Sequence, residues 1–106
     1  MLRELIPEGV DRIVTALCLD YERRAEAIRH RSVGRRTEMQ YRYFNYQLYR
    51  AACEIAGEDD ALLYIDEIGS CTGYANTELT SVSETTYKKI KSEVKLNIAR
   101  ALCLID

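Results

Sequence analysis

The sequence predicts an all-α fold: a single small bundle of four to five helices with a C-terminal helix-turn-helix-like unit. Through most of the chain, apolar residues recur at steps of three and four, the spacing of one face of a helix. No segment alternates apolar and polar residues as a half-buried strand does. The chain has one proline and five glycines, so few positions interrupt a long helix.

The bulk composition is that of a globular protein. A chain of 106 residues has room for one compact domain, and we expect residues 1–106 to form a single helical domain. Hydrophobic residues make up 47% and charged residues 30%, which argues against a disordered chain. No apolar run approaches the about 20 residues of a membrane span, and no export signal opens the chain. We therefore expect a cytoplasmic protein without membrane contact.

The reactive side chains argue against an enzyme. Four cysteines, Cys18, Cys53, Cys71 and Cys103, lie far apart in the sequence, and His30 is the only histidine. A zinc site needs closely spaced ligand pairs, and a nucleophilic triad needs a histidine beside its nucleophile. There is no glycine-rich phosphate loop. We expect reduced cysteines, no catalytic residues, no metal and no cofactor.

The first two predicted helices meet at a basic break. Apolar spacing from Val10 to Ile28 indicates a helix that runs to about residue 30, where the stretch RHRSVGRR interrupts it at Gly34. A second helix is predicted from Thr37 or Glu38 to a glycine cap at Gly57. One stripe of this helix is apolar and predicts core packing: Tyr41, Phe44, Leu48, Ala51, Ala52 and Ile55. Its other stripe mixes tyrosine with arginine: Met39, Arg42, Tyr43, Tyr46, Tyr49, Arg50 and Cys53.

The second half of the chain contains three further predicted elements. A short helix is capped by Asp59 or Asp60 and closed by Gly69. Residues 74–80 indicate two helical turns. Ser83 is a good N-cap for the last helix, with Val82 and Tyr87 placed as a hydrophobic staple. The apolar face of that helix comprises Tyr87, Ile90, Val94, Ile98, Ala101, Leu102 and Ile105.

Charge is strongly segregated along the chain, although the formal net charge is only −2. Residues 21–50 contain eight arginines and three acids, and residues 85–106 contain four lysines and one arginine against two acids. Residues 51–84 contain eight acids and no base. Such an alternation predicts distinct basic and acidic surfaces.

The segment that begins the last helix has the form of a DNA-reading helix. In a helix-turn-helix, the second helix enters the major groove with its N-terminal and exposed polar residues. The residues predicted to contact DNA are Ser83, Glu84, Thr85, Thr86, Lys88, Lys91, Ser92 and Lys95. The interpretation that competes with this one is a well-capped amphipathic helix, which is common in proteins that bind no DNA.

VSETTYKKIKSEVKLNIA, residues 82–99, resembles the C-terminal motif of phage ArpU/RinA-like late-gene transcriptional regulators. The motif residues matched here are Val82, Ser83, Thr86, Tyr87 and Lys91. Ser81 stands where the family has a turn glycine, and Thr77 where it has an alanine. The resemblance covers about the last third of the chain and implies a sigma-like helix-turn-helix over residues 74–95 that binds double-stranded DNA.

Two stripes indicate further contacts. Tyrosine and arginine dominate interface hot spots and stack on bases, so part of the second helix is a candidate surface for phosphate or a partner. The residues assigned to it, together with the preceding basic turn, are Arg35, Arg36, Arg42, Tyr43, Tyr46 and Arg50. Burial of both faces of a central helix would also explain the pattern. Leu96, Ala99 and Cys103, away from the main apolar line of the last helix, are the residues predicted to contact a partner in a homodimer.

Two functions follow from these patterns. The first is a small phage or prophage-type transcriptional regulator that reads duplex DNA with its last helix, while its basic region 23–36 contacts phosphates. The alternative is a phage-type protein inhibitor, similar in kind to an anti-CRISPR, that binds a host nuclease or another nucleic-acid-processing protein through its acidic or its tyrosine–arginine surface. The base-free segment 51–84 motivates this alternative, because a dense acidic surface can dock on a basic channel.

Overall fold

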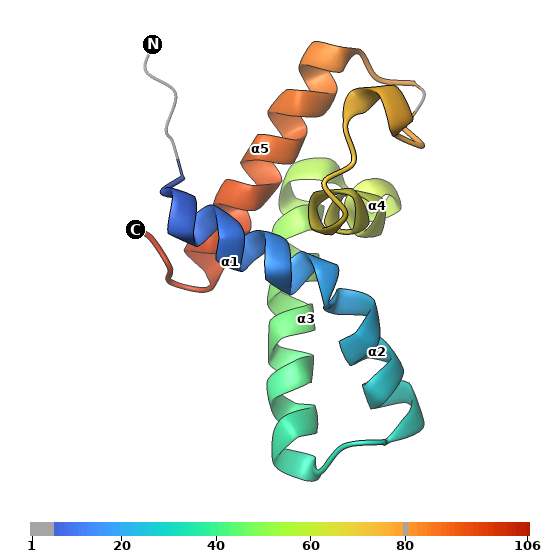
Figure 1. The fold of residues 1–106 in the computed structure, drawn as a ribbon, viewed down its shortest axis with the longest axis vertical. Helices are drawn as coiled ribbons and strands as arrows, with labels where there is room; N and C mark the ends of the chain where they lie inside the picture. The colour runs from blue at the N-terminus through green and yellow to red at the C-terminus, as the bar shows by residue number, and fades with distance from the viewer. Residues whose placement is uncertain (1–5, 80) are drawn as a thin grey trace.

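The computed structural model describes residues 6–79 and 81–106 and confirms an all-α bundle (Figure 1). Among these residues there are five α-helices, one 3-10 helix and no strand. In chain order the elements are α1 (Glu8–Leu19), α2 (Tyr21–His30), α3 (Arg35–Ala56), α4 (Glu58–Gly69), the 3-10 helix η1 (Tyr74–Asn76) and α5 (Glu84–Ala101).

The described residues form a body and a projecting hairpin (Figure 1). In the body, α1 crosses α4 and α5, while the C-terminal half of α3 packs against α4 and α5. The hairpin consists of α2 and the N-terminal half of α3, which pack on each other and extend beyond the other helices. The molecule is therefore elongated, with extents of 45 × 31 × 21 Å.

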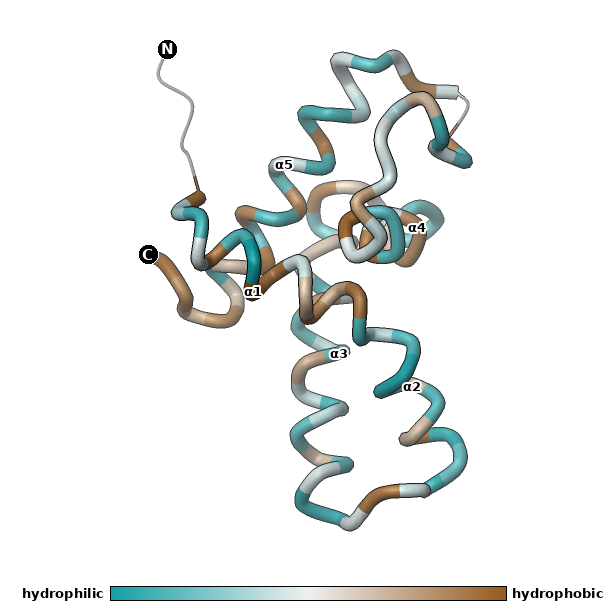
Figure 2. The backbone as a smooth tube through the Cα atoms, viewed as in Figure 1, coloured by the Kyte–Doolittle hydropathy of each residue, from teal (hydrophilic) through white to brown (hydrophobic). Residues whose placement is uncertain are grey.

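The core lies in the body, where α1, α3, α4 and α5 meet. Its largest fully buried side chains are Tyr64, Tyr87, Leu48, Ile65, Ile68, Ile98, Val14 and Val94. Fully burying one such aliphatic side chain contributes about 1.5–3 kcal/mol, so this cluster provides most of the stabilisation of the fold. The hairpin, by contrast, is mainly hydrophilic along its length (Figure 2). The predicted core stripe of α3 is accordingly buried at Leu48, Ala51 and Ala52 but only half-buried at its hairpin end.

The single helix predicted over residues 10–30 is in fact two helices that change direction at Asp20. The Asp20 carboxylate accepts hydrogen bonds from Arg23 and Arg24, the first at 2.6 Å. Arg24, only 2% exposed, also donates to the Leu17 carbonyl oxygen at 2.6 Å and to Asn45 Oδ1 on α3 at 2.7 Å. The guanidinium thus binds groups at the bend and across the hairpin. Apolar spacing alone cannot reveal such a break, because neither proline nor glycine marks it.

Gly69, the last residue of α4, allows that helix to touch the backbone of α1. A Cβ atom at this position would lie 2.5 Å from the Leu19 nitrogen and 2.6 Å from its Cα. Because the obstructing atoms belong to a helix backbone, no side-chain rotation could relieve the overlap. The glycine therefore fixes how closely the two helices cross.

The two helical turns predicted over residues 74–80 are wrong: η1 is a single 3-10 turn, and Thr80 lies outside the described residues. Bonds to side chains replace the helical pattern. Thr77 Oγ1 donates to Glu67 Oε1 at 2.6 Å, and the Glu78 backbone nitrogen donates to Glu67 Oε2 at 3.1 Å. Residues 70–83 therefore separate α4 from α5, and a 3-10 turn stands where the helix-turn-helix assignment needs its first helix.

The start of α5 agrees with the sequence prediction. Ser83 is its N-cap, with Oγ accepting a hydrogen bond from the Thr86 nitrogen at 3.2 Å. Tyr87, Val94 and Ile98 of its apolar face are fully buried. The helix ends at Ala101, because Cys103 adopts a left-handed conformation (φ 58°) and the Leu104 nitrogen donates back to Ala99.

Candidate functional site

The residues predicted to contact DNA lie along the first three turns of α5, but their side chains differ in accessibility. Thr85, Thr86, Lys88 and Ser92 are exposed. Ser83 is occupied as the N-cap, and Glu84 forms an ion pair of 2.7 Å with Lys88. Lys89, which the sequence prediction omitted, is also exposed and forms no ion pair with any described residue.

Lys91 and Lys95, the centre of the predicted reading face, turn toward other parts of the fold. Lys91 Nζ donates to the Thr72 carbonyl oxygen at 2.5 Å and lies 5.6 Å from the centre of the Tyr87 ring. Burial lowers the pKa of Lys91 below its ordinary value, and the nearby Lys95 ammonium lowers it further. Lys95, with 25% of its side chain exposed, forms an ion pair of 3.2 Å with Asp11 of α1. The three predicted lysines therefore do not form a continuous free cationic row.

Glu67 explains why α5 directs polar groups inward. This carboxylate is 3% exposed and accepts hydrogen bonds from Tyr87, Thr77 and the backbone of Glu78. Burial opposes its ionisation, but the three hydrogen bonds outweigh that effect and hold the pKa of Glu67 below its ordinary value. Burial and the bond to Glu67 raise the pKa of Tyr87 to about 12, so its hydroxyl remains a donor. The sequence pattern assigns Glu67 to a solvated acidic face, and its burial is therefore a correction, although Glu67 follows Tyr64 by three residues on the apolar face of α4.

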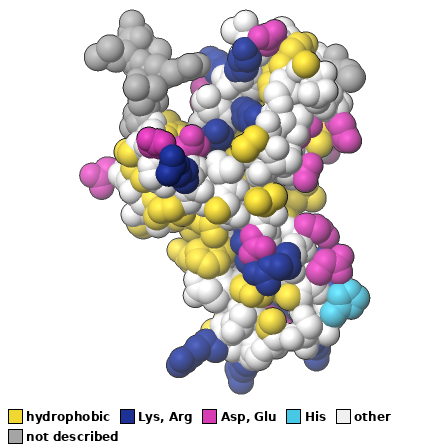
Figure 3. Space-filling view, viewed as in Figure 1, with side chains coloured by type: hydrophobic (Ala, Val, Ile, Leu, Met, Phe, Trp, Pro, Cys, Tyr) yellow, Lys and Arg dark blue, Asp and Glu magenta, His cyan; other side chains and the backbone are white. Residues whose placement is uncertain are grey.

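The tip of the α2–α3 hairpin presents a different set of cations. Residues 29–42 contain five arginines and one glutamate, a formal charge of +4. Arg31, Arg35 and Arg36 are exposed and make no ion pair or hydrogen bond through their side chains within the described chain. Figure 3 shows basic side chains at this end of the molecule, over the α2–α3 turn. Arg31 lies within the basic region 23–36 for which phosphate contacts are predicted, although only Arg35 and Arg36 of this group are named there individually.

Three other surface arginines are paired within their own helices. Arg12 binds Glu8 at 2.6 Å and Arg50 binds Glu54 at 2.7 Å. Arg42, one helical turn from the tip, binds Glu38 at 3.0 Å. The predicted contact residues Arg42 and Arg50 are thus locally neutralised, and the unpaired positive charge is concentrated at the tip.

The mixed stripe of α3 is exposed toward the tip and half-buried toward the body. Met39, Tyr43 and Tyr46 are 63%, 47% and 61% exposed. Tyr49 and Cys53, further along the same stripe, are half-buried. Packing on both sides of α3 therefore explains only the body end of the pattern.

The predicted homodimer contacts need one correction. Ala99 is fully buried among the core residues of its own chain, so its side chain cannot face a partner in this fold. Leu96 is half-buried and Cys103 is exposed. A stripe of three residues for a second copy is therefore not present on α5.

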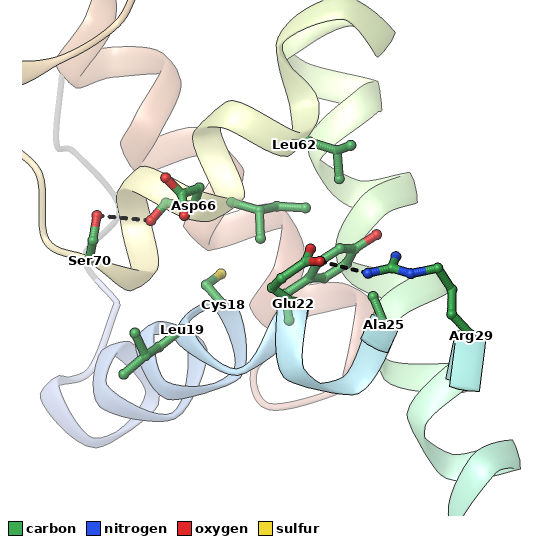
Figure 4. A pocket seen from close by; sticks show the side chains of 10 residues that line it. Cys18, Leu19, Glu22, Ala25, Arg29, Leu62, Asp66 and Ser70 are labelled. Atoms are coloured by element: carbon green, nitrogen blue, oxygen red, sulfur yellow. Dashed lines mark hydrogen bonds and ion pairs between the residues drawn. The ribbon is translucent and has the colours of Figure 1, made fainter. Parts of the chain in front are cut away.

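A cleft of about 280 Å³ opens between α1, α2 and α4 (Figure 4). Cys18 lies at its base, while Leu19 and Leu62 come from opposite walls and are 67% and 52% exposed. Burial raises the pKa of the Cys18 thiol to about 12, so it stays protonated at neutral pH and lacks nucleophilic character. Glu22, beside the cleft, is paired with Arg29 at 2.9 Å. The lining of the cleft therefore combines apolar side chains with charged ones.

Within the described ranges, no three histidine, cysteine, aspartate or glutamate residues lie together where they could hold a metal ion. None of the helices described is long and apolar enough to cross a membrane. Comparison with known proteins gives no match to any family model, curated protein or solved structure.

Proposed function

We propose that the protein binds nucleic acid and that the tip of the α2–α3 hairpin is its phosphate-contacting surface. The observation that carries this proposal is the group of three exposed arginines, Arg31, Arg35 and Arg36, which lie at a projecting end of the molecule and have no carboxylate partner among residues 6–79 and 81–106. Guanidinium groups bind phosphate oxygens through fixed, planar sets of donors. A projecting tip brings those donors to a polyanion without obstruction from the body.

Local energetics at the tip support a role in binding. Arg35 and Arg36 lie in the first turn of α3, where the helix dipole disfavours cations by about 0.3–1 kcal/mol each. Gly34, the N-cap, offers no side chain to the free backbone N–H groups. Arg31 adopts a left-handed conformation (φ 48°), which costs a non-glycine residue on the order of 1 kcal/mol. An approaching phosphate offsets the first two features, and locally unfavourable choices of this kind concentrate at functional sites.

The resemblance to late-gene regulators adds a second possible contact with duplex DNA, at the exposed first turns of α5. Thr85, Thr86, Lys88 and Ser92 remain available there. Lys91 and Lys95 are bound within the fold, so the hairpin tip is the stronger candidate. On this proposal a regulator would anchor on phosphates with the tip, and any reading of bases by α5 would use its first two turns.

A salt titration with charge variants tests the proposal. A labelled duplex of mixed sequence should bind at low salt, with log K falling by about 0.9 per phosphate contact as log salt rises. The triple variant Arg31→Gln/Arg35→Gln/Arg36→Gln should lose about 1,000-fold in affinity or more, since each charge-assisted contact is worth about 1.5–3 kcal/mol. The double variant Arg12→Gln/Arg50→Gln removes exposed but paired arginines and should bind like the wild type. An equal loss of affinity in both variants would show that the tip contributes only general positive charge and is not the contact surface.

An inhibitor that binds a basic protein is the second candidate, and the acidic surface of α4 favours it. Glu58, Asp59 and Asp66 are exposed and form no ion pair in the part of the chain that the structure describes. If this surface docks on a host nuclease, the variant Glu58→Gln/Asp59→Asn/Asp66→Asn should abolish inhibition while the arginine triple variant retains it. Absence of any mobility shift with nucleic acid at low salt would also favour this candidate.

A further inference from the structure

The solvent face of α3 continues from the arginine tip as a line of large, uncovered side chains. Arg35, Met39, Tyr43 and Tyr46 follow one another at steps of three or four residues, so they lie on one side of the helix. Their successive spacing along the helix axis is about 5–6 Å, given a rise of 1.5 Å per residue. The hydroxyl groups of Tyr43 and Tyr46 form no hydrogen bond with any described residue. The Tyr43 ring lies 5.9 Å from the ring of its neighbour Phe44, and neither tyrosine belongs to the core cluster of the described residues.

Two shallow hollows adjoin this line. At the tip, Arg35, Arg36, Met39, Gln40 and Tyr43 surround an open hollow of about 610 Å³. Nearer the body, a groove of about 490 Å³ between α2 and α3 is lined in part by Arg29, Arg42 and Tyr46. Guanidinium groups and tyrosine rings are thus interleaved from the tip toward the body.

On the basis of the proposed phosphate contacts, we propose that this face of α3 binds single-stranded nucleic acid. The backbone would lie against Arg31, Arg35 and Arg36, and unpaired bases would stack on Tyr43 and Tyr46. A duplex exposes phosphates but keeps the faces of its bases stacked inside, so it can use the arginines and not the rings. A single strand offers both, and base–aromatic stacking tolerates any sequence because every base has a π face.

The neighbouring acids limit where the positive charge acts. Glu38 neutralises Arg42, while Glu22 and Glu26 both bind Arg29. Electrostatic attraction therefore comes from the three tip arginines, and the groove supplies mainly ring and methylene surface. Three phosphate contacts on a single strand predict a slope of log K against log salt of about −2.

Exposed tyrosine and methionine side chains could also bind a protein. The need of a base for a flat ring distinguishes a nucleic-acid ligand from a protein ligand. A base needs a flat π face, which phenylalanine retains and leucine lacks, whereas an apolar protein contact tolerates either replacement in part. The substitutions lie on the solvent side of α3 and leave its buried residues unchanged. Circular dichroism and urea unfolding should confirm that each variant keeps its fold.

The test measures fluorescence anisotropy of the full chain with a labelled oligothymidylate of about 15 nucleotides and with a duplex of the same length. The wild type should bind the single strand more tightly. Tyr43→Leu/Tyr46→Leu should weaken single-strand binding about 100-fold, or about tenfold per lost stack, and leave duplex binding unchanged. Tyr43→Phe/Tyr46→Phe should retain single-strand binding. Leu62→Ala, which removes an exposed apolar side chain from α4, should match the wild type on both probes.

Three results would overturn the inference. If the leucine variant binds both probes like the wild type, or if it and the phenylalanine variant lose single-strand affinity equally, the rings are not stacking platforms. If the duplex binds more tightly than the single strand, this face of α3 does not select single-stranded nucleic acid. In each of these cases the phosphate proposal survives provided the arginine triple variant still loses binding. Absence of binding to both probes at low salt would overturn the phosphate proposal as well.

Discussion

Two lysines of α5 and the three arginines of the α2–α3 tip differ in how the fold uses them. Lys91 and Lys95 bind a carbonyl and a carboxylate of neighbouring segments. Arg31, Arg35 and Arg36 bind nothing in the described chain and face solvent at the far end of the hairpin. One group of cations stabilises the fold, and the other is available to a ligand.

Position in the fold accounts for the difference. Along its length α5 packs against α1, α3 and the segment that contains η1, so its flanking polar side chains reach groups that need partners. The hairpin tip projects past these elements and meets only its own two helices. The lysine and arginine content of a sequence therefore gives the number of cations. It does not show which of them are free to bind a ligand, because that depends on which elements pack nearby.

The largest effect is expected at Glu67, the buried acceptor for Tyr87 and the η1 segment. Glu67→Ala leaves the Tyr87 and Thr77 hydroxyls without their acceptor and should lower the free energy of unfolding by about 3 kcal/mol. Urea denaturation followed by circular dichroism measures the change. Asp66→Ala, one residue earlier and exposed, is the matched control and should cost less than about 0.5 kcal/mol. Similar values for the two variants would remove Glu67 from the interactions that hold α5.

Stability should also depend on pH through the same carboxylate. The folded-state pKa of Glu67 lies below its ordinary value of 4.5, so the unfolded chain takes up the proton first as pH falls. Its stabilising contribution is complete above about pH 5 and disappears as pH falls through the folded-state value. Urea midpoints from neutral pH down to about pH 3 should therefore decline more steeply for the wild type than for Glu67→Gln. Parallel curves would assign the acid sensitivity to other groups.

A smaller loss of stability is expected at Lys91 and distinguishes it from its exposed neighbour Lys89. Lys91→Met keeps the apolar stem but removes the donor to Thr72, and should cost about 1 kcal/mol of unfolding free energy. Lys89→Met, at an exposed neighbour without an ion pair in the described residues, should change stability by less than about 0.5 kcal/mol. Equal stability of the two variants would mean that Lys91 is as free as its neighbour, and the lysine face would return as a candidate for contact with DNA.

The smallest effect is expected at the tip. Arg31→Gln/Arg35→Gln/Arg36→Gln should leave the free energy of unfolding within about 0.5 kcal/mol of the wild type, or raise it slightly, since cations leave the positive end of α3. The same urea titration provides the value. A loss above about 1 kcal/mol would show that these guanidiniums serve the fold and would remove the contrast with α5.

Periodicity in the sequence predicts most of the helices, but it does not predict every bend and turn between them. The all-α class, the presence of α3 and α4 and the Ser83 cap of α5 agree with the prediction, because each depends on local spacing or local hydrogen bonds. The predicted cap of α4 at Asp59 or Asp60 is wrong: Gly57 is the N-cap, and both acids lie inside the first turn. The bend at Asp20 and the 3-10 turn near Tyr74 do not, since they depend on Arg24 and Glu67 binding groups distant in the sequence.

In the candidate site too, the sequence predicts which residues matter but not which of them are accessible. The exposed rings and the basic tip lie among residues singled out from their spacing. Their accessibility, and the occupation of Lys91 by Thr72, follow only from tertiary packing. Ala99 falls on the polar side of a helical projection yet is fully buried, because α5 is covered on more than one side.

Arg24 has a consequence that reaches beyond its own contacts. Its guanidinium joins the end of α1, the bend at Asp20 and the middle of α3, so it sets the angle at which the hairpin leaves the body. For the nucleic-acid binding proposed above, these bonds would hold the hairpin in one direction before the ligand arrives. The entropy lost on association is then confined mainly to the side chains of the tip, and a rigid mount of this kind favours tight binding from a small contact area.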